Sequence, residues 1–348
     1  MAKTYTGIDM GSSFLKLAVC NGDSIKKMII EPVPEGLVRD NKITSYDAMA
    51  DFIKRTISAH GGVDKDAALL LPNTMSLTRR LSLPMMTQAE LDLNLPYEFR
   101  DFITDGKDHY VYDYAVLNTV HVTVPLAVDA AVSAKNTPAP GGTLDLLAVA
   151  TRKDTLEDYM RMCRRAGLKV RTALSYAAAL QNLVQASGTK GAQPAADNCC
   201  IIDFGNETTN LYFFSAGTYD VTRALDMGGE AIDRAIADVL GIDEHTAAIH
   251  KESDYAGAQS SEAVLNVCES LAVEIGRALN FYDFNNPDAP IEMAYYSGGG
   301  VALSSLVPTV ARHLEIPLVD VSTIMPTASC DAALRTRCSG AVGATIRG

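Results

Sequence analysis

A strand–turn–strand pattern occurs twice in this chain of 348 residues. The first copy predicts a strand over 5–8, a tight turn over 9–13 and a second strand over 14–20. The second copy, over 199–215, repeats this order, and a further turn and strand follow each copy. Because a P-loop or Rossmann unit passes from its first strand into a helix, the pattern argues against both. It favours an α/β protein built from two similar halves.

Each turn contains the sequence Asp-x-Gly, with Asp9 and Gly11 in the first copy and Asp203 and Gly205 in the second. Glycine has no Cβ, so the backbone N–H groups of such a turn can face a close anion such as phosphate. An aspartate beside phosphate is repulsive unless a cation lies between them, and Mg²⁺, which keeps several of its waters, fits that place. We therefore expect the two halves to clamp one nucleotide by its phosphates, with Asp9 and Asp203 holding Mg²⁺ through water.

One Asp-x-Gly turn alone is more often an ordinary hairpin turn, so the prediction rests on its repetition in matching strands. The pattern assigns no catalytic residue; Asp9 and Asp203 are the candidates if the protein has one.

Other polar residues and glycines extend the predicted nucleotide site. Lys16 is expected to point back towards the first turn as a counter-charge for phosphate, and hydroxyl groups lie beside both turns. Two glycine clusters each precede a predicted helix, where close backbone and the helix N-terminus favour a charged ligand. The predicted nucleotide-binding residues are Asp9, Gly11, Ser12, Ser13, Lys16, Asp203, Gly205, Asn206, Thr208, Thr209, Gly228, Gly229, Gly298, Gly299 and Gly300.

Composition narrows the function classes. The net charge of −12 argues against a nucleic-acid surface, which needs clustered Lys and Arg. The seven cysteines show no CxxC spacing and are odd in number, which predicts reduced thiols rather than a zinc site or disulfide framework. The first residues lack a signal-peptide core, and no stretch approaches the roughly 20 apolar residues that span a bilayer. We expect a cytoplasmic protein that reaches a membrane only through a partner.

The segment 76–172 differs from both halves and is predicted to be an inserted subdomain. It contains predicted strands over 77–83, 110–117 and 144–150, and a loop over 135–142. Thr87 and Glu90 form a capping box for a helix, which Pro96 is expected to kink or split.

The motifs together resemble a known superfamily. Asp9-x-Gly11-Ser12 with Lys16 resembles the first phosphate motif of actin, Hsp70 and the sugar kinases, Asp203-x-Gly205-x-x-Thr208 resembles the second, and 297–300 resembles the adenosine motif. Within that superfamily, the chain resembles the PilM family of type IV pilus assembly proteins over nearly its whole length. The segments that carry this second resemblance are 33–40, 83–98, 166–168 and 340–348.

The resemblance implies an actin-like (ribonuclease H-like) two-lobed α/β fold with an inserted small α+β domain of the 1C (SHS2) type, which the cell-division protein FtsA shares. Lobe I would comprise 1–75, completed by 325–348; the insertion would be 76–172 and the second lobe 173–324. It also places Glu230 and Lys251 beside the ribose and adenine of ATP.

The same resemblance implies a function. PilM-like proteins bind ATP, hydrolyse it poorly or not at all, and hold an N-terminal peptide of the inner-membrane protein PilN. The expected cofactors are therefore ATP and Mg²⁺, and the expected partner is a PilN-like protein that recruits a cytoplasmic scaffold to the membrane. Leu91, Leu95 and Phe99 would line a partner groove if exposed, whereas their helical spacing is equally that of ordinary core residues.

Two departures from the pattern bear on ATP turnover. The segment 172–177 has no acidic residue, and Ala248 stands where relatives often have an acid. We expect weak or absent ATPase activity.

Two alternatives stay open at this point. One is a sugar-kinase-type phosphotransferase, which would need a general-base aspartate. The other is an FtsA-like filament-forming ATPase, although FtsA ends in an amphipathic helix and this chain ends at Gly348.

Overall fold

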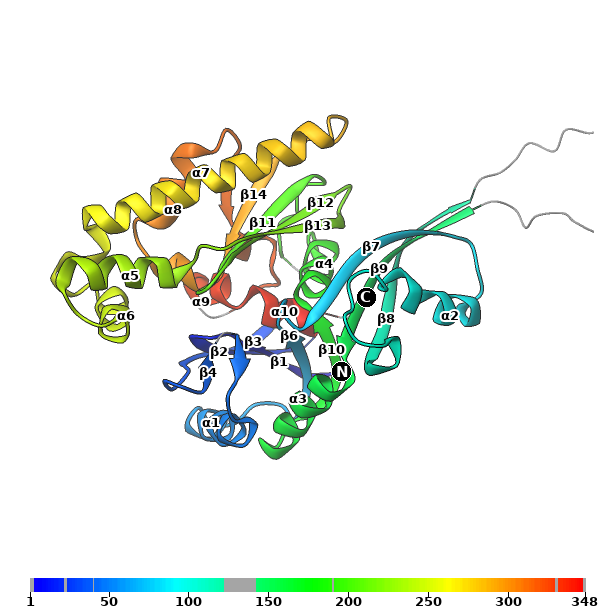
Figure 1. Cartoon of the computed structure of the whole chain (residues 1–348), viewed down its shortest axis with the longest axis horizontal. Helices are drawn as coiled ribbons and strands as arrows, with labels where there is room; N and C mark the ends of the chain where they lie inside the picture. The colour runs from blue at the N-terminus through cyan, green and yellow to red at the C-terminus, as the bar shows by residue number, and fades with distance from the viewer. Residues whose placement is uncertain are drawn as a thin grey trace, which may run out of the picture. The chain divides into compact units, whose positions relative to one another are not determined.

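The computed structural model describes residues 3–21, 24–39, 41–121, 142–189, 191–328 and 331–346 (Figure 1). The chain divides into two compact units. The large unit comprises Met1–Pro72 and Asp158–Gly348, and the inserted unit comprises Asn73–Glu157.

The first sheet of the large unit has five strands in the order β10-β6-β1-β2-β3. β1, β2 and β3 form an antiparallel meander, and β6 and β10 lie parallel to β1. Their bounds are β1 Tyr5–Met10, β2 Phe14–Cys20, β3 Ile25–Pro32, β6 Asp66–Leu71 and β10 Lys169–Ser175. All six residues of β1 are buried, which fits its central place in a sheet covered on both faces.

The second sheet has the order β13-β12-β11-β14-β15, with the same alternation of an antiparallel meander and two parallel strands. Its bounds are β11 Cys199–Phe204, β12 Thr209–Ser215, β13 Thr218–Leu225, β14 Met293–Ser297 and β15 Leu318–Asp320. Strand for strand, β11, β12, β13, β14 and β15 correspond to β1, β2, β3, β6 and β10. The predicted internal repeat is therefore confirmed.

Helices pack against both sheets. Their bounds are α1 Tyr46–Ala59, α3 Lys153–Arg165, α4 Tyr176–Ala186, α5 Gly229–Leu240, α6 Glu244–Ser253, α7 Glu262–Asn285, α8 Leu306–His313, α9 Ala332–Arg337 and α10 Ser339–Thr345. Short elements are β4 Val38–Arg39, β5 Lys42–Ile43, and the 3-10 turns η1 Lys107–His109, η2 Tyr255–Ser260, η3 Gly299–Ala302 and η4 Val321–Ile324.

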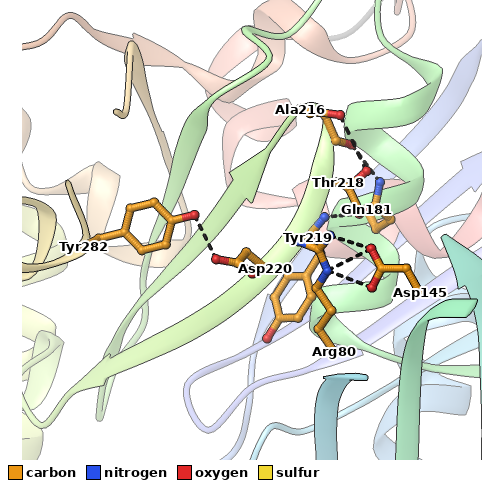
Figure 2. Close-up of polar contacts among 9 residues, drawn as sticks. Arg80, Asp145, Gln181, Ala216, Thr218, Tyr219, Asp220 and Tyr282 are labelled. Carbon is orange, nitrogen blue, oxygen red and sulfur yellow. Dashed lines mark hydrogen bonds and ion pairs between the residues drawn. The ribbon is translucent and has the colours of Figure 1, made fainter. Parts of the chain in front are cut away.

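The long helix α7 covers the second sheet. The rings of Tyr282 on α7 and Phe213 on β12 stack with their centroids 4.2 Å apart. The Tyr282 hydroxyl donates to Asp220 on β13 at 2.9 Å (Figure 2). Both contacts fix the C-terminal half of α7 over the sheet.

Helix α10 packs closely on the first sheet and on α4. A Cβ at Gly7 would lie 1.8 Å from the Ala341 carbonyl oxygen, and one at Gly343 would lie 2.2 Å from the Ala179 carbonyl oxygen. Only glycine permits this approach at either position. The C-terminal segment thus completes the half of the large unit that contains the first sheet.

Helix α4 connects the two sheets. The side chain of Gln181 donates to the Gly217 carbonyl at 3.0 Å and accepts from the Tyr219 backbone N–H (Figure 2). Gln181 is buried, and both polar atoms of its side chain form hydrogen bonds with the β12–β13 turn.

The inserted unit contains a three-stranded antiparallel sheet in the order β7-β9-β8, with helix α2 against it. Bounds are β7 Ser76–Pro84, α2 Gln88–Glu98, β8 Tyr110–His121 and β9 Gly142–Arg152. Arg80 on β7 pairs with Asp145 on β9, with Nε 2.9 Å from Oδ1 (Figure 2). The Thr87–Glu90 capping box is present, as predicted.

Three sequence predictions need comment here. Pro96 was expected to kink or split the helix; it does not split it, because α2 continues through Pro96 and ends two residues later at Glu98. The insertion was expected to end at 172, whereas the compact inserted unit ends at Glu157 and β10 pairs with β6 in the large unit. Residues 135–141 of the predicted loop lie outside the described residues. Among the described residues, no helix has the length and apolar character to cross a membrane.

Candidate nucleotide site

The first Asp-x-Gly turn joins β1 to β2. Its geometry is set by Gly11, whose N–H donates to the Phe14 carbonyl at 3.0 Å. The register of the two strands places Asp9 opposite Lys16, and Nζ of Lys16 lies 3.5 Å from Oδ2 of Asp9. Both side chains are buried. The Ser12 and Ser13 hydroxyls have no hydrogen-bond partner among the described residues and are free for a ligand.

The second turn has the same construction in the second sheet. The Gly205 N–H donates to the Thr208 carbonyl at 3.1 Å, and a Cβ at Gly205 would lie 2.5 Å from that oxygen. Thr209 is fully buried and donates its hydroxyl to the Met227 carbonyl at 2.8 Å. It therefore holds the Gly228 segment in place, and its proton is not available for a phosphate as the sequence prediction supposed.

The two turns meet around Lys16. Burial acts to lower the pKa of Lys16, but the negative charges of Asp9 and Asp203 outweigh it and the pKa is raised. Burial raises the pKa of Asp203, although the positive charge of Lys16 opposes this. The positive charge of Lys16 thus interacts with two buried carboxyl groups that come from different sheets. The structure therefore brings Asp9, Lys16 and Asp203 together, as predicted.

Gly228 and Gly229 pack directly on the second turn. The Gly229 N–H donates to the Gly205 carbonyl at 3.1 Å, and the Glu230 N–H donates to the Asn206 carbonyl at 2.8 Å. A Cβ at Gly228 would lie 2.5 Å from the Asn206 carbonyl oxygen. The glycines are needed for this close backbone packing, which positions the start of α5 beside the turn.

Lys251 and Glu230 lie at the edge of the same group. Nζ of Lys251 is 2.8 Å from Oδ1 of Asp233 and 3.4 Å from the Gly229 carbonyl oxygen. Burial raises the pKa of Glu230 and of Asp233. The Lys251–Asp233 pair joins α6 to α5, and Asn206 of the second turn donates to the Glu230 carboxylate at 3.4 Å.

The third glycine cluster follows β14. Gly298 has φ of +100°, and a Cβ there would lie 2.5 Å from the Phe204 carbonyl oxygen and 2.6 Å from Oδ1 of Asp203. At Gly299, by contrast, a Cβ would meet nothing nearer than Phe14 Cδ2 at 4.0 Å. Gly298 therefore packs tightly on the second turn, as does Gly300, where a Cβ would lie 2.9 Å from Phe204 Cβ, whereas Gly299 faces open space beside Phe14.

Several residues of this site were missed by sequence reasoning. The hydroxyl of Tyr176, the first residue of α4, donates to Oδ1 of Asp203 at 3.3 Å. Burial, with the charges of Asp203 and Asp9, raises the pKa of Tyr176 well above its ordinary value. Tyr176 lies in the segment 172–177 that lacks an acidic residue, and no local pattern marks a lone tyrosine as part of a site.

Two further missed segments come from the C-terminal half. The Thr336 carbonyl accepts from the Gly298 N–H at 3.3 Å, and the Ser339 hydroxyl lies 2.5 Å from that of Ser297. Gln259 bridges α6 and the segment after η3: it donates to the Lys251 carbonyl at 2.8 Å and accepts from the Ser304 N–H at 3.0 Å. Only the folded topology brings these residues to the turns.

The carboxyl groups fit a metal bound through phosphate and water. Among the described residues, no group of three or more His, Cys, Asp and Glu side chains could hold an ion alone. Oδ2 of Asp9 is buried without a hydrogen-bond partner, so it retains acceptor capacity. A Mg²⁺ ion that keeps most of its waters needs only one or two carboxylates with phosphate oxygens.

The expected partner-binding residues lie elsewhere. Leu91, Leu95 and Phe99 are at most 2% exposed and form the core of the inserted unit with strands β7 and β9. The structure therefore assigns them to the core, because this face of α2 is the one that covers the sheet.

The chain was compared with protein families, with curated proteins and with solved structures. The family model described as "Type IV pilus assembly protein PilM" matches residues 7–336. A solved "PilM-PilN type IV pilus biogenesis complex" is 21% identical with a TM-score of 0.77, over 99% of this chain and 98% of that chain. The ethanolamine utilization protein EutJ from Carboxydothermus hydrogenoformans is 14% identical with a TM-score of 0.58, over 99% and 90%. No curated protein matches. The fold is actin-like, as the sequence predicted.

Proposed function

The chain belongs to the PilM family of type IV pilus assembly proteins, and on that basis we propose that it is an ATP-binding, actin-like scaffold of type IV pilus assembly. The observation that carries the nucleotide part is the meeting of two like turns around one buried lysine. Lys16 pairs with Asp9 and lies close enough to Asp203, from the other sheet, for their charges to interact. A ligand bound there contacts both halves of the large unit at once.

The residues divide into three roles in this proposal. Lys16, the Ser12 and Ser13 hydroxyls and the backbone of both turns bind the phosphates. Asp9 and Asp203 would hold Mg²⁺, which would neutralise phosphate charge when bound. Glu230, Lys251 and the glycines 228–229 and 298–300 border the ribose and adenine.

Weak or absent hydrolysis is part of the proposal. Activation of a water needs a group that can accept its proton at neutral pH. The residue that reaches Asp203 from the start of α4 is Tyr176, and its raised pKa keeps the phenol protonated. A protonated phenol donates a hydrogen bond and cannot act as that base, so the start of α4 supplies no base for hydrolysis.

The partner is proposed from the family. The matched complex contains PilM and PilN. We propose that this chain binds the N-terminal peptide of a PilN-like inner-membrane protein and so becomes peripheral to the cytoplasmic face of the membrane.

Calorimetric titration with ATP and Mg²⁺ tests the nucleotide part. Wild-type protein is expected to bind, and Asp9→Ala to bind at least about tenfold more weakly, because a charged contact is lost. The matched control is Asp288→Ala, an exposed aspartate outside the site. Equal ATP affinity of Asp9→Ala and wild type, with circular dichroism unchanged, contradicts the assignment.

Fluorescence anisotropy with a labelled N-terminal peptide of the PilN-like partner tests the scaffold part. The peptide is expected to bind wild-type protein, and a peptide of scrambled sequence is the control. Equal binding of both peptides refutes specific recognition, whatever the outcome with ATP.

A further inference from the structure

Arg337, the last residue of α9, is partly buried and carries guanidinium nitrogens that have no hydrogen-bond partner among the described residues. Its Cζ lies 4.7 Å from the ring centroid of Phe14, the first residue of β2. Nε and Nη2 of Arg337 are buried and have no hydrogen-bond partner among the described residues. No described carboxylate forms an ion pair with it.

This arrangement is energetically incomplete without an anion. Removing a charge from water is costly unless the charge is paired and hydrogen-bonded. The aromatic face of Phe14 attracts the cation, but this contact leaves the N–H donors unused. The guanidinium therefore stacks on Phe14 with one face and has unpaired N–H donors at its edge. These donors can bind an acceptor that has several oxygens.

The position of Arg337 identifies that acceptor. Phe14 directly follows Ser12 and Ser13 of the first turn. The Thr336 carbonyl accepts from the Gly298 N–H, and Cys338 lies close enough to Lys16 to affect the pKa of that lysine. Arg337 therefore lies between the first turn and the Gly298 turn, on the segment that borders Lys16.

We propose that Arg337 is a phosphate-binding residue of the nucleotide site, held in place by Phe14 and donating to oxygens of the triphosphate. The inference rests on the proposed ATP binding and adds to it a second cation, supplied by the C-terminal segment. The planar guanidinium matches the geometry of phosphate oxygens, which an ammonium does not. Bound triphosphate would thereby fix α9 against the first turn.

Calorimetry with a ligand series tests the proposal. Wild type, Arg337→Met and Arg337→Lys are titrated with ATP plus Mg²⁺, with tripolyphosphate and with adenosine. Arg337→Met is expected to weaken ATP and tripolyphosphate binding about tenfold or more and to leave adenosine affinity within about twofold. The affinity of Arg337→Lys for ATP and tripolyphosphate is expected to lie between those of wild type and Arg337→Met. Lysine keeps the positive charge but lacks the planar set of guanidinium N–H donors. The control is Arg277→Met, whose side chain on α7 is 72% exposed.

Melting temperatures separate phosphate binding from a structural role. Without nucleotide, Arg337→Met is expected to melt no lower than wild type, because an unpaired buried charge is removed; with ATP it should lose most of the ligand-induced rise. A lower melting temperature without ligand, an equal loss for ATP and adenosine, or no loss at all overturns the proposal. If wild type binds no ATP, the proposed function fails and this inference with it; if wild type binds and Arg337→Met binds equally, only this inference fails.

Discussion

At the scale of single residues, Asp203 shows how the site opposes the stability of the fold. It is 9% exposed, and burial raises its pKa above the ordinary value. A group whose pKa is raised by folding stabilises the folded state below its unfolded pKa and loses that contribution as pH rises through the folded pKa. At neutral pH, this buried carboxyl group therefore lowers the stability of the nucleotide-free protein.

The first prediction is that Asp203→Asn stabilises the nucleotide-free protein at pH 7.5. Asparagine keeps an acceptor for the Tyr176 hydroxyl and leaves Lys16 paired with Asp9. The expected gain is about 1 kcal/mol, or roughly 1–2 °C in melting temperature, and it should shrink towards pH 4. Thermal unfolding at both pH values measures it. A variant that is less stable than wild type at both pH values contradicts the electrostatic argument.

The glycines and Arg337 show what sequence could and could not predict about the site. Gly11 and Gly205 belong to short patterns in which turn and strands are adjacent in sequence, so their meaning is local. Tyr176, Thr336 and Arg337 reach the same place through the packing of α4, α9 and α10. No motif within a few residues of these three positions indicates a binding site, so a single sequence could not identify them.

At the scale of elements, the same division between local and long-range information holds. The meander β1–β2–β3 and its counterpart β11–β12–β13 were predicted, because turns and alternation fix neighbouring strands. The end of the insertion was misplaced because β10 pairs with β6, a strand about 100 residues earlier in the chain. The capping box at the start of α2 was predicted correctly, but which face of the helix is buried depends on the sheet that it covers.

The second prediction concerns how elements hold the nucleoside side of the site. Gln259, 8% exposed, links the Lys251 carbonyl to the Ser304 N–H and hydroxyl. Gln259→Ala is expected to lower the free energy of unfolding by about 2 kcal/mol, because buried partners lose their hydrogen bonds. Without touching ATP, it should also weaken ATP binding by about 1 kcal/mol, roughly fivefold.

Chemical unfolding and calorimetry measure the two effects of Gln259→Ala. Gln193→Ala, at an exposed glutamine, is the control and should change neither quantity. A loss of stability without any loss of ATP affinity would mean that Gln259 supports the core and does not position the site.

At the scale of the whole molecule, the two sheets of the large unit are joined by contacts that border the nucleotide site. Tyr176 reaches Asp203 from α4, and Asn41 between β4 and β5 donates to Glu207 in the second turn. Gln181 binds the β12–β13 turn from the same helix as Tyr176. A ligand held by Lys16, Asp9 and Asp203 would add a further connection between the sheets. Its binding should therefore stabilise both sheets.

The third prediction is that ATP with Mg²⁺ slows amide hydrogen exchange in both sheets together. Protection is expected at the turns 9–13 and 203–209 and at 297–300, because a ligand that binds only the folded site reduces the openings that expose those amides. Asp9→Ala, which should not bind, is the control. Hydrogen exchange followed by mass spectrometry resolves these segments. If the two turns clamp one nucleotide, neither turn can be protected alone. Protection confined to one sheet would mean that the ligand binds only one half of the large unit. The internal repeat would then play no part in binding it.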